Sequence, residues 1–425
     1  MNVPKLRFRD DDGLEFPSWH AKKIGDFVTS HKGGAPLKPS DFIKEGSFEV
    51  IPKKAISSGG HLNLDKAEPT YCTADFFEKN QRSVVDKNYL ITTLRDLVPS
   101  GPSIGYIVKF NNAKKYILAQ GVYGIKISDV LLDKFLIQYS NTDNYRVLMQ
   151  TMMVGSTQVH IRNSDFFKTR FCVPCLDEQT KIANFLTAVD EKITHLTQKY
   201  DLLTQYKKGV MQKIFSQELR FKDDDGREFP EWTKDNLLNL SASGFTNGVF
   251  NDPAKVGSGY KLINVLDMYI DTTIDENNLS LVELSEAEFK KNKVKCGDTF
   301  FTRSSLVKSG IAYSNVYMGT SDDVTFDGHL IKMSPKLDKV DPLFLNYVLR
   351  TEAVRKQLIT RGKTATMTTI GQADIAEVNI DIPSLKEQTI IANFLTSIDD
   401  KITQTQEELA AVKQYKQGLL QQMFV

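Results

Sequence analysis

Cysteine is scarce in this chain, and long apolar runs are missing. The 425 residues include only four cysteines, too few for a disulfide scaffold. No apolar run approaches the roughly 18 residues that a membrane-spanning helix needs, so we expect no membrane contact. The first residues, MNVPKLRFRDDDG, contain no apolar signal core and turn acidic within ten positions, which does not favour secretion. We therefore expect a reduced, cytoplasmic protein.

An excess of charge of one sign is also missing. The 54 lysines and arginines nearly balance 53 aspartates and glutamates, for a net charge of +1. This balance excludes a strongly basic coat for nucleic acid but permits a local basic face. Hydrophobic residues make up 41% and charged residues 25%, which is typical of globular proteins. At one domain per ~150 residues, the length predicts two or three domains.

Signatures of catalysis and metal binding are weak. The segment RGKT at 361–364 is similar to the end of a phosphate-binding loop, but Gln357 stands where that loop needs its first glycine. The segment CVPC at 172–175 has redox or half-zinc spacing, but no second cysteine pair could complete a zinc site. The six histidines show no metal-ligand spacing, and no N/D-P-P-Y/F adenine-methylating motif occurs. We expect a chain without catalytic residues and without a metal site.

Two sequence blocks occur twice. LRFRDDDGLEFPSW at 6–19 recurs as LRFKDDDGREFPEW at 219–232, with eleven of fourteen positions identical. EQTKIANFLTAVDEKIT at 178–194 recurs as EQTIIANFLTSIDDKIT at 387–403, with thirteen of seventeen identical. Such internal repetition indicates two copies of one structural unit in the chain.

The blocks between the repeats, roughly 20–172 and 233–381, look largely unrelated to each other. Both have the composition of mixed α/β domains with short strands. A frame that is kept twice around diverging blocks indicates two equivalent domains with different specificities. The alternative is a duplication in which the loops drifted without selection.

Each second repeat opens a heptad pattern of nearly 40 residues, which predicts a helix of about 60 Å. The expected helix-pairing positions are Ile182, Leu186, Val189 and Ile193 in the first helix and Ile391, Leu395, Ile398 and Ile402 in the second. Lys207 and its counterpart Lys416 interrupt the pattern. The simplest arrangement pairs the helices antiparallel about a pseudo-twofold axis, with a globular domain at each end. The alternative is that each helix packs only on its own domain.

The expected fold class is therefore α/β (α+β), with two globular domains separated by two long antiparallel coiled-coil helices. The expected parts are a leading segment with the first domain (1–172), a central helix (173–217), a repeated leading segment with the second domain (218–381) and a C-terminal helix (382–425). Ser384 and Glu387 match an S-x-x-E capping box at the start of the last helix.

Polar and basic residues near the end of each block suggest contacts with DNA. GDTFFTRSS at 297–305 predicts a strand that runs into a turn, and a basic helix followed by a Gly/Thr loop comes later in the same block. Such groups suit phosphate positioning and hydrogen bonds to base edges. The alternative is a solvated helix face. The candidate DNA-contacting residues, expected on loops, are Gln158, His160, Arg303, Ser304, Arg361, Lys363 and Thr364.

The repeated frame resembles type I restriction-modification specificity subunits. The resemblance rests on EQTKIANFLTAVDEKI and EQTIIANFLTSIDDKI ahead of the heptad helices, and on LRF-x-DDDG-x-EFP-x-W before each variable block. GSTQ in the first block and GDTFFTRSS in the second are also similar to family patterns. The resemblance covers essentially the whole chain.

The resemblance implies a non-catalytic subunit in which each variable block is a target recognition domain for one half of a bipartite site in double-stranded DNA. It also implies that the helices set the spacing between the halves and dock two methyltransferase subunits, with two motor-nuclease subunits joining for cleavage. By the same resemblance S-adenosylmethionine, ATP and Mg²⁺ belong to those partners. The rival hypotheses are a fused DNA methyltransferase or nuclease, and a coiled-coil scaffold with two protein-binding domains.

Overall fold

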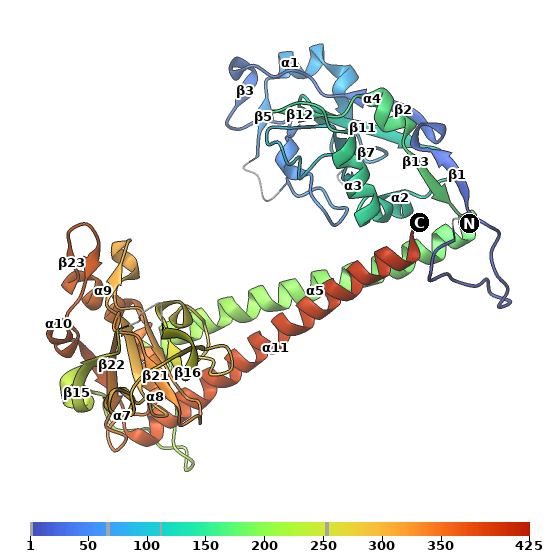
Figure 1. The fold of residues 1–425 in the computed structure, drawn as a ribbon. Helices are drawn as coiled ribbons and strands as arrows, with labels where there is room; N and C mark the ends of the chain where they lie inside the picture. The colour runs from blue at the N-terminus through green and yellow to red at the C-terminus, as the bar shows by residue number, and fades with distance from the viewer. Residues whose placement is uncertain (1–2, 65–68, 111–112, 251–254) are drawn as a thin grey trace. The chain divides into compact units, whose positions relative to one another are not determined.

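The chain forms two compact units, which we describe separately. The computed structural model describes residues 3–64, 69–110, 113–250 and 255–425 (Figure 1). Unit 1 comprises Met1–Gln198 and Gln406–Val425, and unit 2 comprises Lys199–Thr405. Both units mix helices and strands, and the chain contains two long helices, so the predicted fold class is confirmed. In the described part of the chain, no helix is both long enough and apolar enough to cross a membrane.

Short elements make up most of unit 1. Its strands are β1 (His20–Lys23), β2 (Val28–Gly33), β3 (Phe42–Ile43), β4 (Val50–Ile51), β5 (Tyr71–Cys72), β6 (Val84–Val85), β7 (Leu90–Thr93), β8 (Arg95–Asp96), β9 (Ile107–Lys109), β10 (Tyr116–Leu118), β11 (Val122–Ile127), β12 (Val159–His160) and β13 (Arg170–Val173). Its short helices are α1 (Ala74–Lys79), α2 (Asp133–Tyr139), α3 (Asp143–Met152) and α4 (Asn163–Lys168).

Unit 2 is built in the same manner. Its strands are β14 (Thr233–Asn236), β15 (Ser241–Asn247), β16 (Val256–Ile263), β17 (Ser280–Val282), β18 (Thr299–Thr302), β19 (Ser304–Ser305), β20 (Ser314–Val316), β21 (Val324–Phe326), β22 (Leu330–Pro335), β23 (Lys363–Thr364), β24 (Thr368–Thr369) and β25 (Asn379–Ile382). Its short helices are α6 (Leu237–Leu240), α7 (Glu286–Asn292), α8 (Pro342–Leu349), α9 (Glu352–Arg361) and α10 (Gln372–Ala376).

The main sheets of the two variable blocks share one topology. The main sheet of unit 1 is antiparallel with strand order β2-β11-β7-β9, and that of unit 2 is antiparallel with order β15-β22-β18-β20. In both units a second, smaller sheet contains one parallel pair, β4 with β10 and β16 with β21. The sequence comparison missed this relationship, because a sheet requires the same alternation of buried positions and not the same residues.

The two long helices are α5 (Leu176–Phe215, 40 residues) and α11 (Leu385–Met423, 39 residues). In unit 1 the first part of α5 runs antiparallel to the last part of α11, since Asp190 pairs with Lys416 and Lys192, further along α5, pairs with Glu408. In unit 2 the last part of α5 meets the first part of α11, where Lys207 pairs with Asp399. The helices therefore pack on each other within both units, and not only on their own domains.

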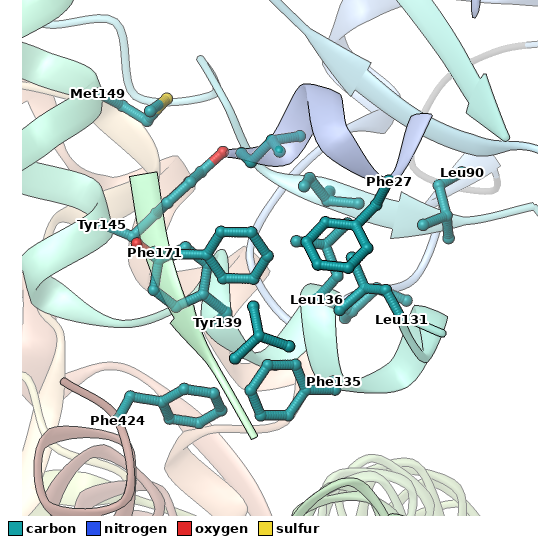
Figure 2. Packing of buried hydrophobic residues seen from close by; sticks show 14 of the residues in the cluster. Phe27, Leu90, Leu131, Phe135, Leu136, Tyr139, Tyr145, Met149, Phe171 and Phe424 are labelled. Carbon is teal, nitrogen blue, oxygen red and sulfur yellow. The ribbon is translucent and has the colours of Figure 1, made fainter. Parts of the chain in front are cut away.

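In each unit, aromatic side chains pack the C-terminal end of one long helix against the globular domain. In unit 1, Phe424 packs against Phe135, with ring centroids 5.2 Å apart (Figure 2). It also packs against Trp19, with ring centroids 6.4 Å apart. In unit 2, Phe215 at the end of α5 packs against Trp232 and Phe344 at 6.4 and 5.8 Å. Phe424 is the repeat counterpart of Phe215, so each domain receives the end of the helix that follows the other domain.

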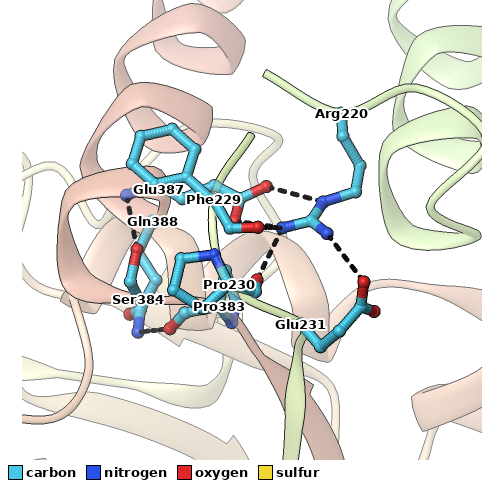
Figure 3. A network of polar contacts seen from close by, with 8 residues as sticks. All are labelled: Arg220, Phe229, Pro230, Glu231, Pro383, Ser384, Glu387 and Gln388. Atoms are coloured by element: carbon cyan, nitrogen blue, oxygen red, sulfur yellow. Dashed lines mark hydrogen bonds and ion pairs between the residues drawn. The ribbon is translucent and has the colours of Figure 1, made fainter. Parts of the chain in front are cut away.

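The repeated leading segment is an ion-paired clamp on the start of each long helix. The Arg220 guanidinium binds the fully buried Glu387 carboxylate at 2.9 Å and donates to the carbonyls of Phe229 and Pro230 (Figure 3). In unit 1, Arg7 binds the buried Glu178 in the same way at 2.7 Å. The two leading segments have similar sequences because each must fit the same kind of helix start.

The predicted capping box forms only in part. The Ser384 hydroxyl accepts a long hydrogen bond of 3.5 Å from the backbone N–H of Glu387. The Glu387 carboxylate binds Arg220 rather than the cap (Figure 3). A buried carboxylate is stabilised more by a bidentate guanidinium than by one backbone N–H. This explains why Glu387 pairs with Arg220 and does not complete the capping box.

Candidate nucleic-acid interface

In unit 2 the structure brings most of the predicted DNA-contacting residues together on a small sheet with strand order β19-β24-β23. Ser304 on β19 and Lys363 on β23 both pair with Thr369 on the central strand. Arg303 immediately precedes β19, and its backbone is fixed by hydrogen bonds to His329 and Ile370. Its side chain is exposed. In Figure 1, β23 lies at the outer edge of unit 2.

Several side chains of this sheet face solvent. Lys363 is 78% exposed and lies 3.5 Å from Asp374, a distance at which an exposed ion pair contributes little. Thr364 is exposed, and its hydroxyl lies 3.0 Å from that of Thr368. Arg361, by contrast, is half-buried and donates to backbone carbonyls. The sheet thus presents to solvent the Lys363 ammonium group, which is only weakly paired with Asp374, and the side chains of Thr364 and Thr369.

The equivalent place in unit 1 is the strand pair β8–β12. His160 on β12 pairs with Arg95 on β8, and Val159 pairs with Asp96. Gln158 is exposed one residue before β12. Both predicted residues of this block, Gln158 and His160, therefore lie at the position that corresponds to β24.

The prediction that the candidate residues lie on loops is wrong for several of them. Ser304, Lys363, Thr364 and His160 all belong to strands of two residues. Strands this short show no alternating pattern, so the sequence alone cannot distinguish them from loops. Their pairing partners are distant in the sequence.

Two arginines of the basic stretch in the second block make hydrogen bonds inside the domain. Arg350 donates to the carbonyls of Asp271 and Ile270, and Arg355 donates to those of Ser309, Ile311 and Ala312. Burial lowers the pKa of the Arg355 guanidinium. These two arginines hold loops in place inside the domain.

Seven of the eight predicted helix-pairing positions, all except Ile193, lie in or against the cores of the units. Buried among them are Ile182 and Leu186 in unit 1 and Ile391, Leu395 and Ile398 in unit 2. Half-buried are Val189, Ile193 and Ile402. Each core combines residues of α5 and α11 with residues of the adjacent domain. These positions therefore serve both the helix pair and the docking of the domain.

A family model for the type I restriction modification DNA specificity domain matches residues 18–205 and 257–414, well over half of the chain. The chain belongs to this family. It is also similar to the specificity subunit of the type I restriction enzyme MjaVIII from Methanocaldococcus jannaschii, with 22% identity over 423 residues, or 97% of this chain and 94% of the relative. The EcoKI specificity subunit of Escherichia coli is 21% identical over 306 residues, which cover 69% of this chain and 65% of that relative.

Solved structures show the same fold. The type I restriction-modification S subunit from M. genitalium superposes with a TM-score of 0.61 at 15% identity, over 100% of this chain and 99% of that chain. A chain from a study of complex assembly and conformational transition of the type I R-M system gives 0.54 at 17% identity, over 96% and 98%. At such identities the similarity establishes the fold alone.

With the specificity family identified, we use its term target recognition domain for the variable blocks. In the first such domain the sequence analysis missed Arg95. This residue occupies the position of Ser304 in the second domain and lies beside His160. The signal was present in the sequence, since TLRDLV at 93–98 aligns with TRSSLV at 302–307 at the same offset as the repeated helix.

Proposed function

We propose that this chain is the DNA-specificity subunit of a type I restriction-modification complex. Each target recognition domain reads one half of a bipartite site in double-stranded DNA. The observation that carries the proposal is a duplicated frame around two domains whose main sheets share one topology and whose half-buried side chains differ at equivalent positions, as at Arg95 and Ser304. Two domains of the same shape with different polar groups suit two half-sites of different sequence.

The proposed DNA-facing residues are those on and beside the small strand pairs: Gln158, His160, Arg303, Ser304, Arg361, Lys363 and Thr364. Arg303 has the chemistry to grip a guanine edge, and Lys363 suits a phosphate oxygen. Arg361 is half-buried. We therefore propose that it supports the small sheet and does not contact a base. Arg95 joins the set in the first domain.

The chain supplies recognition and not catalysis in this proposal. Two methyltransferase subunits dock on the paired helices, and two motor-nuclease subunits join the complex for cleavage. S-adenosylmethionine, ATP and Mg²⁺ belong to those partners. The complex acts on DNA in the cytoplasm, and the helix pair fixes the distance between the two half-sites.

Exchange of one domain tests the proposal. Residues 233–381 are replaced by the equivalent block of a relative, and methylated adenines are mapped in cells that also express the methyltransferase subunit. We expect one half of the methylated sequence to change while the other half and the gap stay the same. Methylation that ignores the exchange, or that changes in both halves, would contradict independent reading by two domains.

A further inference from the structure

An exposed Leu-Val pair follows the small strand pair in both target recognition domains. Leu97 and Val98 follow β8, and Leu306 and Val307 follow β19. The four side chains are 60%, 45%, 85% and 62% exposed. Leucine and valine thus occupy equivalent, solvent-facing positions in two blocks that otherwise diverge in sequence.

The turn that carries each pair has the same internal hydrogen bonds. The backbone N–H of Val98 donates to Asp96 Oδ1, and that of Val307 donates to the Ser305 hydroxyl, both at 3.3 Å. The carbonyl of each valine accepts from the glycine three residues later at 3.0 Å. Different side chains at positions 96 and 305 thus make the same contact, so the shape of the turn is retained.

A partly buried arginine holds each turn from behind. Arg146 on α3 donates to the carbonyls of Pro102 and Ile104. Arg355, at the equivalent position of α9, donates to the carbonyls that follow the second turn. Each arginine links a turn to a helix of the domain core, so the exposed pairs sit on fixed supports. A rigid support reduces the entropy lost when such a side chain binds a partner.

We propose that these two pairs are apolar wedges that contact duplex DNA at a base step in each half-site. The inference rests on the proposed function. Leu306 and Val307 directly follow β19, and Arg303, Lys308 and Lys363 expose cationic groups on the same turn and small sheet. Cations next to an apolar tip suit DNA, where phosphates flank stacked bases. Leucine is among the side chains that proteins insert between base steps.

The presence of the same Leu-Val pair in both domains also fits duplex DNA as the partner. The two domains read different sequences, so groups that select bases must differ, as Arg95 and Ser304 do. A wedge contacts the faces of stacked bases, which every sequence offers, and the same residues serve both half-sites. A docking site for a copy of the methyltransferase subunit would also be the same in both domains, and the experiment separates these two partners.

The test uses the full chain in complex with its methyltransferase subunit. After the methylated site has been mapped, duplexes carry 2-aminopurine at each position of one half-site in turn. We expect a rise in fluorescence at one step in each half-site, apart from any rise at the methylated adenine. Leu306→Ala with Val307→Ala should abolish the rise in its own half-site and weaken binding on the order of tenfold, which corresponds to loss of one buried leucine side chain.

The chain provides its own controls. The unchanged Leu97–Val98 turn should keep its signal in the other half-site, and Leu97→Ala with Val98→Ala should reverse the pattern. Leu266→Ala removes another leucine of unit 2, 83% exposed, and should change neither signal. Fluorescence that stays unchanged in both double variants would overturn the proposal. Loss of co-purifying methyltransferase with DNA contacts intact would show that the pairs dock that protein instead. Methylation independent of this chain would contradict the proposed function itself.

Discussion

Lys207 on α5 and Asp399 on α11 form an ion pair, with 2.5 Å between Nζ and a carboxylate oxygen and both side chains largely buried. Tyr347 completes the site by donating its hydroxyl to Asp399 at 2.7 Å. The same relationship recurs in unit 1 between Lys416 and Asp190 at 2.6 Å. The lysines that interrupt the heptad pattern are therefore paired and not misplaced, and a buried polar pair of this kind favours one helix register over others.

Loss of one partner should destabilise unit 2. In Lys207→Ala the Asp399 carboxylate stays largely buried without its cation, and we expect unfolding to become easier by up to about 3 kcal/mol. Urea unfolding followed by circular dichroism measures this change. Lys208→Ala removes the adjacent, exposed lysine and should stay within about 0.5 kcal/mol of wild type. Equal effects of both variants would show that the pair does not hold the helices in register.

The ion pairs also determine where residues can be inserted into the two long helices without loss of their register. The interval from Asp190 to Lys207 along α5 equals that from Asp399 to Lys416 along α11. Four residues inserted after Thr194 alone make these intervals unequal. Four residues inserted after both Thr194 and Thr403 keep them equal, and lengthen each helix by about 6 Å.

We expect the double insertion to widen the unspecified gap of the methylated site by one or two base pairs, because ~6 Å is close to two steps of about 3.4 Å. Both half-sites should keep their sequences. The single insertion should lower the yield or the activity of the complex, since only one of the two ion pairs can form in register. Mapping of methylated adenines decides between these outcomes, and an unchanged gap in an active double-insertion variant would exclude the helices as the ruler.

Lys363 should act on affinity and not on sequence preference. Its exposed ammonium group on the small sheet of unit 2 suits a phosphate. Lys363→Ala should weaken binding to all duplexes and make the slope of log K against log salt shallower by about 1. Lys290→Ala on α7, exposed to a similar degree, is the control and should leave the slope as in wild type. The same slope in both variants would remove Lys363 from the DNA interface.

Glu276 gives unit 2 a pH-dependent contribution to stability. Its carboxylate accepts hydrogen bonds from the Tyr317 hydroxyl and from the backbone N–H groups of Thr320 and Ser321, which lower its pKa from 4.5 to about 2. A lowered pKa in the folded state means that the stabilisation is complete above about pH 4.5 and is lost as the pH falls towards 2.

Glu276→Gln should therefore lower the urea midpoint at pH 7, and the difference from wild type should shrink below pH 5. Urea titrations at pH 7, 5 and 3 measure the trend. Glu377→Gln, at an exposed position of the same unit, should hardly change the midpoint at any of these values. A difference that grows on acidification would reverse the sign and contradict the role of Glu276.

The sequence by itself determined the features that depend on neighbouring residues. Heptad spacing fixed the lengths of α5 and α11, since a helix is a local structure with a period that can be read from its apolar residues. The repeated blocks fixed the presence of two equivalent units. Strands such as β11 (VYGIKI) and β18 (within GDTFFTRSS) were also predictable from β-branched and aromatic composition.

Only the tertiary structure decided which distant residues meet. It placed Ser304 next to Thr369 on strands too short to show a pattern, and it showed that Arg355, one of the basic residues of the second block, supports a turn. It also paired Lys207 with Asp399, although a lysine on an apolar seam looks like a defect until its partner on the other helix is known. Such contacts depend on long-range packing, for which a single sequence carries no local signal.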